Sequence, residues 1–242
     1  NSTFTSYLYM GCNIMGVLKS LILISLLGCT PSGGAAIVDN AERTVEYVSR
    51  STASVIEQSR ESSVEILSYD SEGGQIGGAY VRYKNNYFIL TAAHVVAESS
   101  MAMVSHGDEK IIAKVLYFNH ETDLAILGIE GMFTREPLMW RTADPAIGDE
   151  VVYNGYPNGY PSLTIKGNVS GHVGPNMILH SYAWSGASGS AVLDRKGRIV
   201  GVLSAVDIGY AFGAIPQIVE DVVIVVPIQG LKIEDLLLSL SN

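Results

Sequence analysis

Cysteine is almost absent from this chain, and charged side chains are few. Its only two cysteines, Cys12 and Cys29, lie within the first 29 of 242 residues, so the remainder has no disulfide. Small secreted domains often depend on disulfides because their cores are small, whereas this chain must rely on its apolar core. Lys and Arg number 15 against 24 Asp and Glu, with no basic cluster, which argues against nucleic acid as a partner.

Charged residues make up 16% of the sequence, whereas 48% of it is apolar and 25 residues are glycine. Long charged helices are therefore not expected, and the composition favours many short strands joined by turns. The length suits one domain of moderate size, or a compact two-lobed barrel domain preceded by an extra segment.

The first part of the chain reads as a leader over residues 1–28. A single Lys19 precedes a short apolar run, Leu21–Leu27, which has the size of a signal-peptide core and falls short of the roughly 20 residues that span a bilayer. The segment Leu26-Leu27-Gly28-Cys29 resembles the lipobox of bacterial lipoproteins. That resemblance implies cleavage before Cys29 and lipid attachment to it. An ordinary signal peptide with an incidental cysteine is the alternative.

Residues 29–60 are expected to form a tether and a short helical segment, since residues 30–36 are rich in Gly, Pro and Ala and residues 37–58 fall partly at helical spacing. Residues 61–242 form the predicted main domain. Its apolar runs recur at short intervals without alternating helices, which indicates an all-β barrel or sandwich. The expected strands are 64–67, 79–83, 87–91, 111–118, 124–129, 150–154, 163–172, 176–180, 191–194, 199–205 and 222–227, followed by a helix within 228–240.

Three segments place His94, Asp123 and Ser188 in the local context that nucleophilic catalysis requires. His94 follows a strand in Thr-Ala-Ala-His, Asp123 precedes the apolar run Leu-Ala-Ile-Leu, and Ser188 lies in Gly-Ala-Ser-Gly-Ser. A serine hydroxyl is a weak nucleophile that needs an imidazole to take its proton, and the imidazole needs a carboxylate to orient it. Each residue alone also has a structural reading, as a strand-end histidine, a turn-capping aspartate and a serine in a hairpin turn.

Together these segments resemble the trypsin-like serine protease family, and within it the HtrA/Deg-like branch, over about residues 60–228. Further matches follow the same order: Gly-Gly-Ala-Tyr-Val before the histidine, Val-Tyr-Asn-Gly-Tyr-Pro at 152–157, and Gly-Arg-Ile-Val-Gly-Val at 197–202. The resemblance implies a chymotrypsin fold, in which two six-stranded β-barrels form the active site in the cleft between them.

The resemblance also implies that His94, Asp123 and Ser188 form a catalytic triad and that the backbone N–H groups of Gly186 and Ser188 form an oxyanion hole. This chain departs from the family pattern at Ala187, where Asp or Asn is usual, and at Ser190, where Gly is usual. The HtrA branch normally continues into a PDZ domain, and the residues after Pro227 are too few for one.

By the family pattern, Tyr182 lies at the base of the specificity pocket, and Ser204, Ala205 and Val206 line one wall. Because no acidic residue lies at that base, the pattern argues against cleavage after Lys or Arg. An apolar side chain is the expected preference.

The sequence therefore predicts an endopeptidase that cleaves polypeptides through an acyl-enzyme, with neither a metal nor a cofactor, held on the bacterial cell envelope by a lipid on Cys29. Without lipidation it would be secreted or periplasmic. One alternative is a protease-fold lipoprotein that holds unfolded segments and cleaves them slowly or not at all. Another is a hydrolase of esters or other acyl groups.

Overall fold

The computed structural model describes residues 53–68, 76–96, 99–211, 215–229, 231–233 and 236, all within one compact unit. Within 207–211 and 215–220 it describes the backbone alone. The expected leader, the lipobox with Cys29, and residues 29–52 of the expected tether lie outside these residues. Within the described part the structure is almost entirely β, with thirteen strands and only short helical segments.

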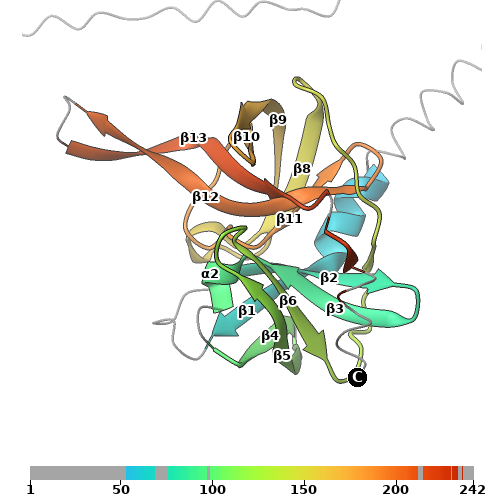
Figure 1. Ribbon diagram of the computed structural model, residues 1–242. Helices are drawn as coiled ribbons and strands as arrows, with labels where there is room; N and C mark the ends of the chain where they lie inside the picture. Colours follow the sequence, from blue (N-terminus) through green and yellow to red (C-terminus); the bar gives the residue numbers. More distant parts are fainter. Residues whose placement is uncertain are drawn as a thin grey trace, which may run out of the picture. The chain divides into compact units, whose positions relative to one another are not determined.

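The first barrel is built from six strands that close on themselves (Figure 1). The strands run β1-β4-β5-β6-β3-β2, and the barrel closes because β1 pairs with β2 as well as with β4. A short seventh strand adds to β2 in parallel. The strands are β1 (Ser63–Ser68), β2 (Ile76–Tyr83), β3 (Asn86–Thr91), β4 (Met101–His106), β5 (Glu109–Asn119), β6 (Leu124–Ile129) and β7 (Leu138–Met139).

The second barrel is also closed and six-stranded, in the order β10-β13-β12-β11-β8-β9. All of its neighbouring strands are antiparallel. Figure 1 shows β12 and β13 continuing well beyond the barrel as a two-stranded ribbon. Its strands are β8 (Glu150–Gly155), β9 (Leu163–Val173), β10 (Asn176–Ser181), β11 (Ala191–Asp194), β12 (Ile199–Ala211) and β13 (Ile215–Pro227).

Two apolar clusters fill the structure, and strand alternation divides residues between them. On β11, Val192 packs into the second barrel, whereas Ala191 and Leu193 belong to the same cluster as the core of the first barrel. Successive side chains of a strand point to opposite faces, so a strand buried on both faces serves two cores. The apolar contact between the barrels fixes how their loops face each other.

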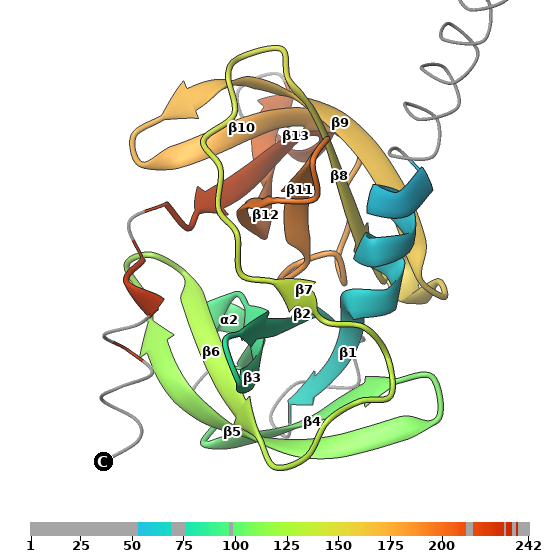
Figure 2. The ribbon, with the colours of Figure 1, turned by 90° about the vertical axis from the view of Figure 1, so that its right-hand side faces the viewer.

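A helix over residues 53–62 and the connection between β6 and β8 also join the two halves. The helix packs Val55 into the apolar cluster of the first barrel, and its Arg60 donates to Thr164 on β9 at 3.0 Å. Figure 2 shows the β6–β8 connection passing alongside both barrels, with β7 beside β2. None of the helices in the described residues has the length and apolar character needed to cross a bilayer.

The expected all-β fold with two six-stranded barrels is confirmed. The sequence analysis missed β4 and β7. β4 has few of the β-branched and aromatic residues that favour strands, and it forms because it pairs with β1 on one side and β5 on the other. The strands expected at 199–205 and 222–227 are longer, because they pair on to Ala211 and Ile215. Of the helix expected within 228–240, only Ile233 and Leu236 are described as helical, and most of it lies outside the described residues.

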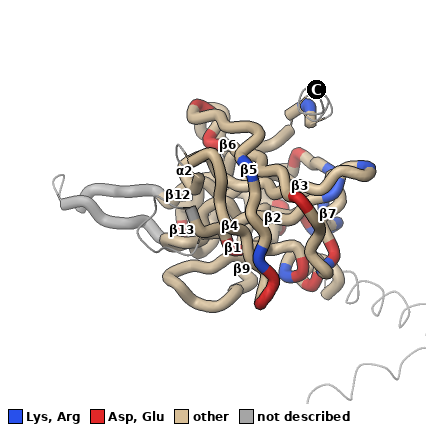
Figure 3. Tube along the Cα trace, turned by 90° about the horizontal axis from the view of Figure 1, so that it is seen from below, with Lys and Arg blue, Asp and Glu red and all other residues tan. Residues whose placement is uncertain are grey.

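Charged residues are scattered over the described part of the chain. In Figure 3 Lys and Arg positions lie among Asp and Glu positions, with no continuous basic stripe on the face shown. Two ion pairs lie at the surface, Arg135 with Glu61 at 2.8 Å and Lys166 with Glu150 at 3.3 Å. Such pairs contribute about 0–1 kcal/mol each, so the apolar clusters carry the stability of the barrels.

Candidate active site

His94 and Asp123 lie side by side at the ends of two paired strands of the first barrel. His94 lies in α2 (Ala93–Val96), the short turn after β3, and Asp123 immediately precedes β6, which pairs with β3. The carboxylate oxygens of Asp123 lie 3.0 and 2.9 Å from Nδ1 of His94. Because an ionised carboxylate only accepts hydrogen bonds, Nδ1 carries a proton, and in the neutral form of the ring Nε2 is then the acceptor. The imidazole is about half exposed, so a substrate can reach it.

Asp123 holds the whole start of α2 as well as the ring. Its carboxylate accepts the backbone N–H of His94 at 2.9 Å, and its carbonyl accepts the N–H of Ala93 at 3.1 Å. The backbone of Asp123 is left-handed, with φ of 46°, a conformation that Asp tolerates better than most residues. Burial acts to raise the pKa of Asp123, but hydrogen bonds from the His94 ring, the Ser204 hydroxyl and the His94 N–H outweigh it and lower the pKa.

Ser188 lies on the loop between β10 and β11, and both barrels hold its backbone. The Ser188 carbonyl accepts the N–H of Gly77 on β2 at 2.9 Å, and the next residue, Gly189, donates to Leu203 on β12 at 2.7 Å. Gly189 has φ of +82°, and any side chain there would overlap the Gly77 carbonyl and the Thr91 hydroxyl. Only glycine fits this position, because the loop passes directly against the first barrel.

Ser204 connects the serine with the His94–Asp123 pair. Its hydroxyl donates to Asp123 Oδ2, and its backbone carbonyl accepts the Ser188 hydroxyl at 3.2 Å. The sequence analysis assigned Ser204 only to the pocket wall and missed this contact, which joins residues 81 positions apart. In this structure the Ser188 hydroxyl therefore points at the Ser204 carbonyl.

The two N–H groups expected to bind an oxyanion lie on either side of Ala187. The N–H of Ala187 donates to the Trp184 carbonyl at 2.9 Å, which closes a four-residue turn with Gly186 in its third position at φ +96°. Neither the Gly186 nor the Ser188 N–H donates to a backbone carbonyl among the described residues. Ser185, in the second position, is not among the residues with positive φ, and a turn with positive φ at the third position alone is of type II, for which glycine is the usual residue.

A cavity of about 360 Å³ opens directly beside Ser188. Its lining contains no charged side chain and consists of Trp184, Ser185, Ser188, Leu203, Ser204, Ala205 and Val206. Three of these, Ser204, Ala205 and Val206, are the residues expected to form the pocket wall.

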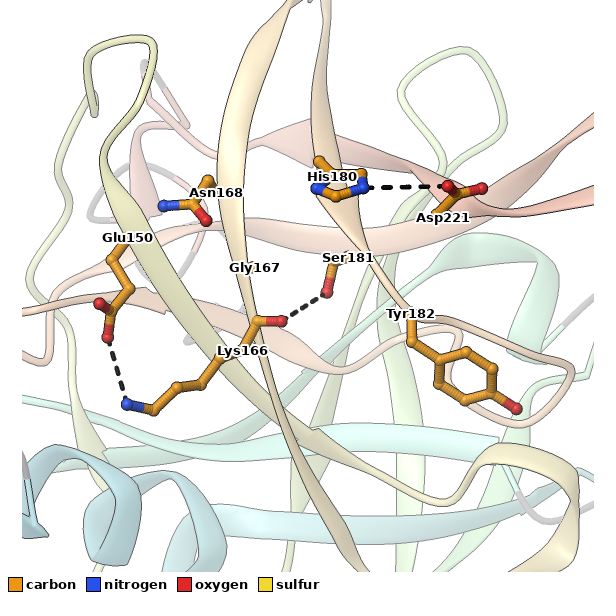
Figure 4. Close-up of a pocket in the computed structure, with 8 residues that line it drawn as sticks. All are labelled: Glu150, Lys166, Gly167, Asn168, His180, Ser181, Tyr182 and Asp221. Atoms are coloured by element: carbon orange, nitrogen blue, oxygen red, sulfur yellow. Dashed lines mark hydrogen bonds and ion pairs between the residues drawn. The ribbon is translucent and has the colours of Figure 1, made fainter. Parts of the chain in front are cut away.

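Tyr182, the residue expected at the pocket base, does not line this cavity. It lines a separate polar groove of about 600 Å³ on the outer face of the second barrel, together with two ion pairs, Lys166 with Glu150 and His180 with Asp221 (Figure 4). The buried Tyr153 hydroxyl donates to the Tyr182 carbonyl and holds that carbonyl inward, and the Tyr182 side chain is 43% exposed.

Ser190, at the position where the family pattern has glycine, is fully buried. It lies between Gly77 and Gly155, where a Cβ on either glycine would overlap its hydroxyl. Its Oγ is the one buried side-chain oxygen or nitrogen without a hydrogen-bond partner in the described part of the chain.

We expect Ser190→Ala to raise the free energy of unfolding by about 1 kcal/mol, because a buried hydroxyl without a partner costs about 1–3 kcal/mol. Urea denaturation would measure this as a higher midpoint at an unchanged slope. Ser181→Ala is the matched control, since the Ser181 hydroxyl is buried but donates to the Lys166 carbonyl at 3.2 Å; its loss should destabilise by a similar amount. Equal destabilisation by both variants would contradict the assignment of Ser190 as unpaired.

Among the residues that the structure describes, no group of three or more His, Cys, Asp or Glu side chains gathers as a metal site would require. The residues brought together are an imidazole oriented by a carboxylate, a serine hydroxyl, and two backbone N–H groups without backbone partners. This set can transfer an acyl group through a covalent intermediate.

Comparisons with known proteins show similarity to proteases. Residues 78–202, just over half of the chain, match the family model of the trypsin-like peptidase domain. A mitochondrial Do-like protease of Arabidopsis thaliana is 41% identical over 101 residues, which span 38% of this chain and 17% of the relative. A protein of Pseudomonas putida named as a periplasmic DegP-like serine endoprotease is 27% identical over 144 residues, 56% of this chain and 30% of the relative. The chain thus spans well under half the length of these relatives.

Solved structures share the fold. The active form of a protease from Mycobacterium tuberculosis superposes with a TM-score of 0.59 at 22% identity, covering 76% of this chain and 82% of that one. A serine endoprotease from Yersinia pestis gives a TM-score of 0.60 at 18% identity, covering 75% and 65% respectively.

Proposed function

Since the chain belongs to the trypsin-like peptidase domain family, we propose that it is a serine endopeptidase with Ser188 as nucleophile, His94 as general base and Asp123 as the carboxylate that orients His94. The observation that carries this proposal is the contact of both Asp123 carboxylate oxygens with Nδ1 of His94, beside a serine loop held by both barrels.

In the proposed reaction the Ser188 hydroxyl first rotates from the Ser204 carbonyl toward Nε2 of His94. Its oxygen bonds to the peptide carbonyl carbon while its proton passes to His94. The carbonyl oxygen becomes an oxyanion, which the N–H groups of Gly186 and Ser188 bind. His94 then gives the proton to the leaving amine as the C–N bond breaks. Water then attacks the acyl carbon while His94 takes its proton, and the same N–H groups bind the oxyanion that forms. The ester bond to Ser188 breaks as His94 returns the proton to the Ser188 oxygen, which releases the acid.

Fluorophosphonate labelling of the purified full chain tests the nucleophile, since the reagent reacts with activated serines. The proposal expects label on the parent protein and none on Ser188→Ala. Absence of label on the folded parent would contradict it. That outcome would favour the second candidate function, a protein that holds unfolded polypeptides, for which the Ser188 hydroxyl facing Ser204 is the supporting observation.

The cavity beside Ser188 supports an apolar preference at the residue before the cleaved bond. Its lining has no charge to pair with Lys, Arg or Glu, and burying an unpaired charge is costly. We expect kcat/KM for peptides with Val or Leu there to exceed that for Lys or Glu by roughly 100-fold, or about 2.7 kcal/mol.

A panel of peptides that differ only at that residue measures this preference. Tyr182→Ala is the control, because Tyr182 lines the separate groove and its loss should leave the ranking of peptides unchanged. A ranking that shifts with Tyr182→Ala would instead support the pocket base expected from the family pattern.

We further propose a location on the bacterial cell envelope, which the periplasmic name of the Pseudomonas putida relative supports. Lipid attachment at Cys29 rests on the sequence alone. Metabolic labelling with a palmitate analogue, in parent and Cys29→Ser proteins, tests it.

A further inference from the structure

The turn over residues 184–187 has two possible forms, and nothing within it selects one. Type I and type II turns share the closing hydrogen bond, here from Ala187 N–H to the Trp184 carbonyl. They differ by rotation of the central peptide group, the one between Ser185 and Gly186. Glycine at the third position permits both forms, because it adopts positive and negative φ about equally readily.

The orientation of that peptide group decides where the Gly186 N–H points. No cis peptide bond occurs in the described residues, so the Ser185 carbonyl and the Gly186 N–H point in opposite directions. In the observed type II form, φ of Gly186 is +96°. In the type I form the carbonyl of Ser185 would take the place of the N–H, and an oxyanion there would meet an oxygen in place of a donor.

A contact from outside the turn holds the observed form. The backbone N–H of Asn158 donates to the Ser185 carbonyl at 2.6 Å. Asn158 lies in the short 3₁₀ segment Pro157–Gly159 after β8, which is closed by the Tyr160 N–H on the Pro157 carbonyl at 3.1 Å. Since Pro157 is buried, this segment is anchored to the barrel and can fix the position of the Ser185 carbonyl.

The backbone of Asn158 is left-handed, with φ 55° and ψ 29°. Only three non-glycine residues in the described part of the chain have positive φ: Lys84 in the turn between β2 and β3, Asp123 at the candidate triad, and Asn158. Such conformations persist where the surroundings enforce them, and they concentrate at functional sites. Asn is among the residues that tolerate this conformation best.

We propose that Asn158 is a positioning residue of the oxyanion hole, whose backbone N–H holds the peptide between Ser185 and Gly186 in the form that directs the Gly186 N–H at the substrate oxyanion. This role rests on the proposed peptidase function. Asn158 acts through Ser185 and Gly186 and touches no reacting atom.

Three substitutions at residue 158 in the full-length protein test the role. Asn158→Gly keeps the N–H and accepts a positive φ, so kcat should stay within about twofold of the parent. Asn158→Val keeps the N–H but resists positive φ, and kcat should fall about tenfold. Asn158→Pro has no N–H and fixes φ near −65°, and kcat should fall about 100-fold, the lower end of the cost of losing one oxyanion donor.

A purely structural role for Asn158 would change the melting temperature and the fraction of folded protein, which circular dichroism measures. The positioning role predicts a lower kcat at unchanged KM, and a matching loss of affinity for a peptide boronate, which binds as a tetrahedral adduct. Rescue by Gly relative to Val is the decisive comparison if Asn158→Pro does not fold.

Equal kcat in the Gly and Val variants would overturn the positioning role, as would an unchanged kcat in folded Asn158→Pro. Both results leave the peptidase proposal standing. A parent protein that reacts with neither fluorophosphonate nor boronate would instead contradict the proposed peptidase function, and with it the positioning role that depends on that function.

Discussion

Replacing Ser188 by alanine is expected to lower kcat by on the order of a million-fold while the protein stays folded. The hydroxyl supplies the nucleophile, and its only described hydrogen bond is to the Ser204 carbonyl, so its loss costs little stability. His94→Ala should reduce kcat by a similar factor, because an unassisted serine hydroxyl is a poor nucleophile. The measurement is peptide hydrolysis with purified parent and variant proteins.

Two controls make this result specific. Ser170→Ala removes an exposed hydroxyl from β9 and should leave kcat unchanged within about twofold. The double variant Ser188→Ala with His94→Ala should be no slower than either single variant, because the two residues act as one unit. Additive losses would argue against a shared catalytic role.

Asp123→Asn is expected to lower kcat about 10⁴-fold with little change in KM. The carboxylate accepts from the His94 ring, the His94 N–H and the Ser204 hydroxyl. An amide has one oxygen and one NH₂ group, so at least one of these donors would face another donor. The histidine would then favour the wrong tautomer, with the proton on Nε2. Asp144→Asn, at an exposed position, is the control for loss of one negative charge.

The same variant tests the pH dependence of stability. The pKa of Asp123 is lower in the folded chain than its ordinary value, so the unfolded chain binds the proton more readily. Its contribution to the free energy of unfolding is therefore complete above about pH 4 and is lost as pH falls through the lowered pKa. Denaturation from pH 7 to pH 3 should show the stability gap between parent and Asp123→Asn closing at the acid end. A gap that stays constant across this range would contradict the lowered pKa.

Local patterns in the sequence were sufficient for the fold class and for the three residues proposed as a triad. Short apolar runs bounded by turn residues predict strands, as in β3 and β6. Glycines on both sides of Ser188 predict a tight loop because few other residues adopt its backbone angles. β4, which is poor in such residues, could not be found this way, because its formation depends on two neighbouring strands.

The placement of the site depended on contacts that the sequence does not reveal. Ser204 reaches Asp123 across 81 residues, Gly77 holds the Ser188 carbonyl from the other barrel, and Asn158 holds that of Ser185. Tyr182 lies six residues before Ser188, as the family pattern expects, yet its carbonyl is held by Tyr153 while its side chain faces another groove.

The sequence by itself determined most of the strands, the turns and the kinds of residue available for catalysis, since these depend on side-chain type and on near neighbours in the chain. Only the tertiary structure decided which hydroxyl, carboxylate and N–H groups meet. The physical reason is that a hydrogen bond depends on distances of about 3 Å and on direction, and these are set by how two closed barrels pack.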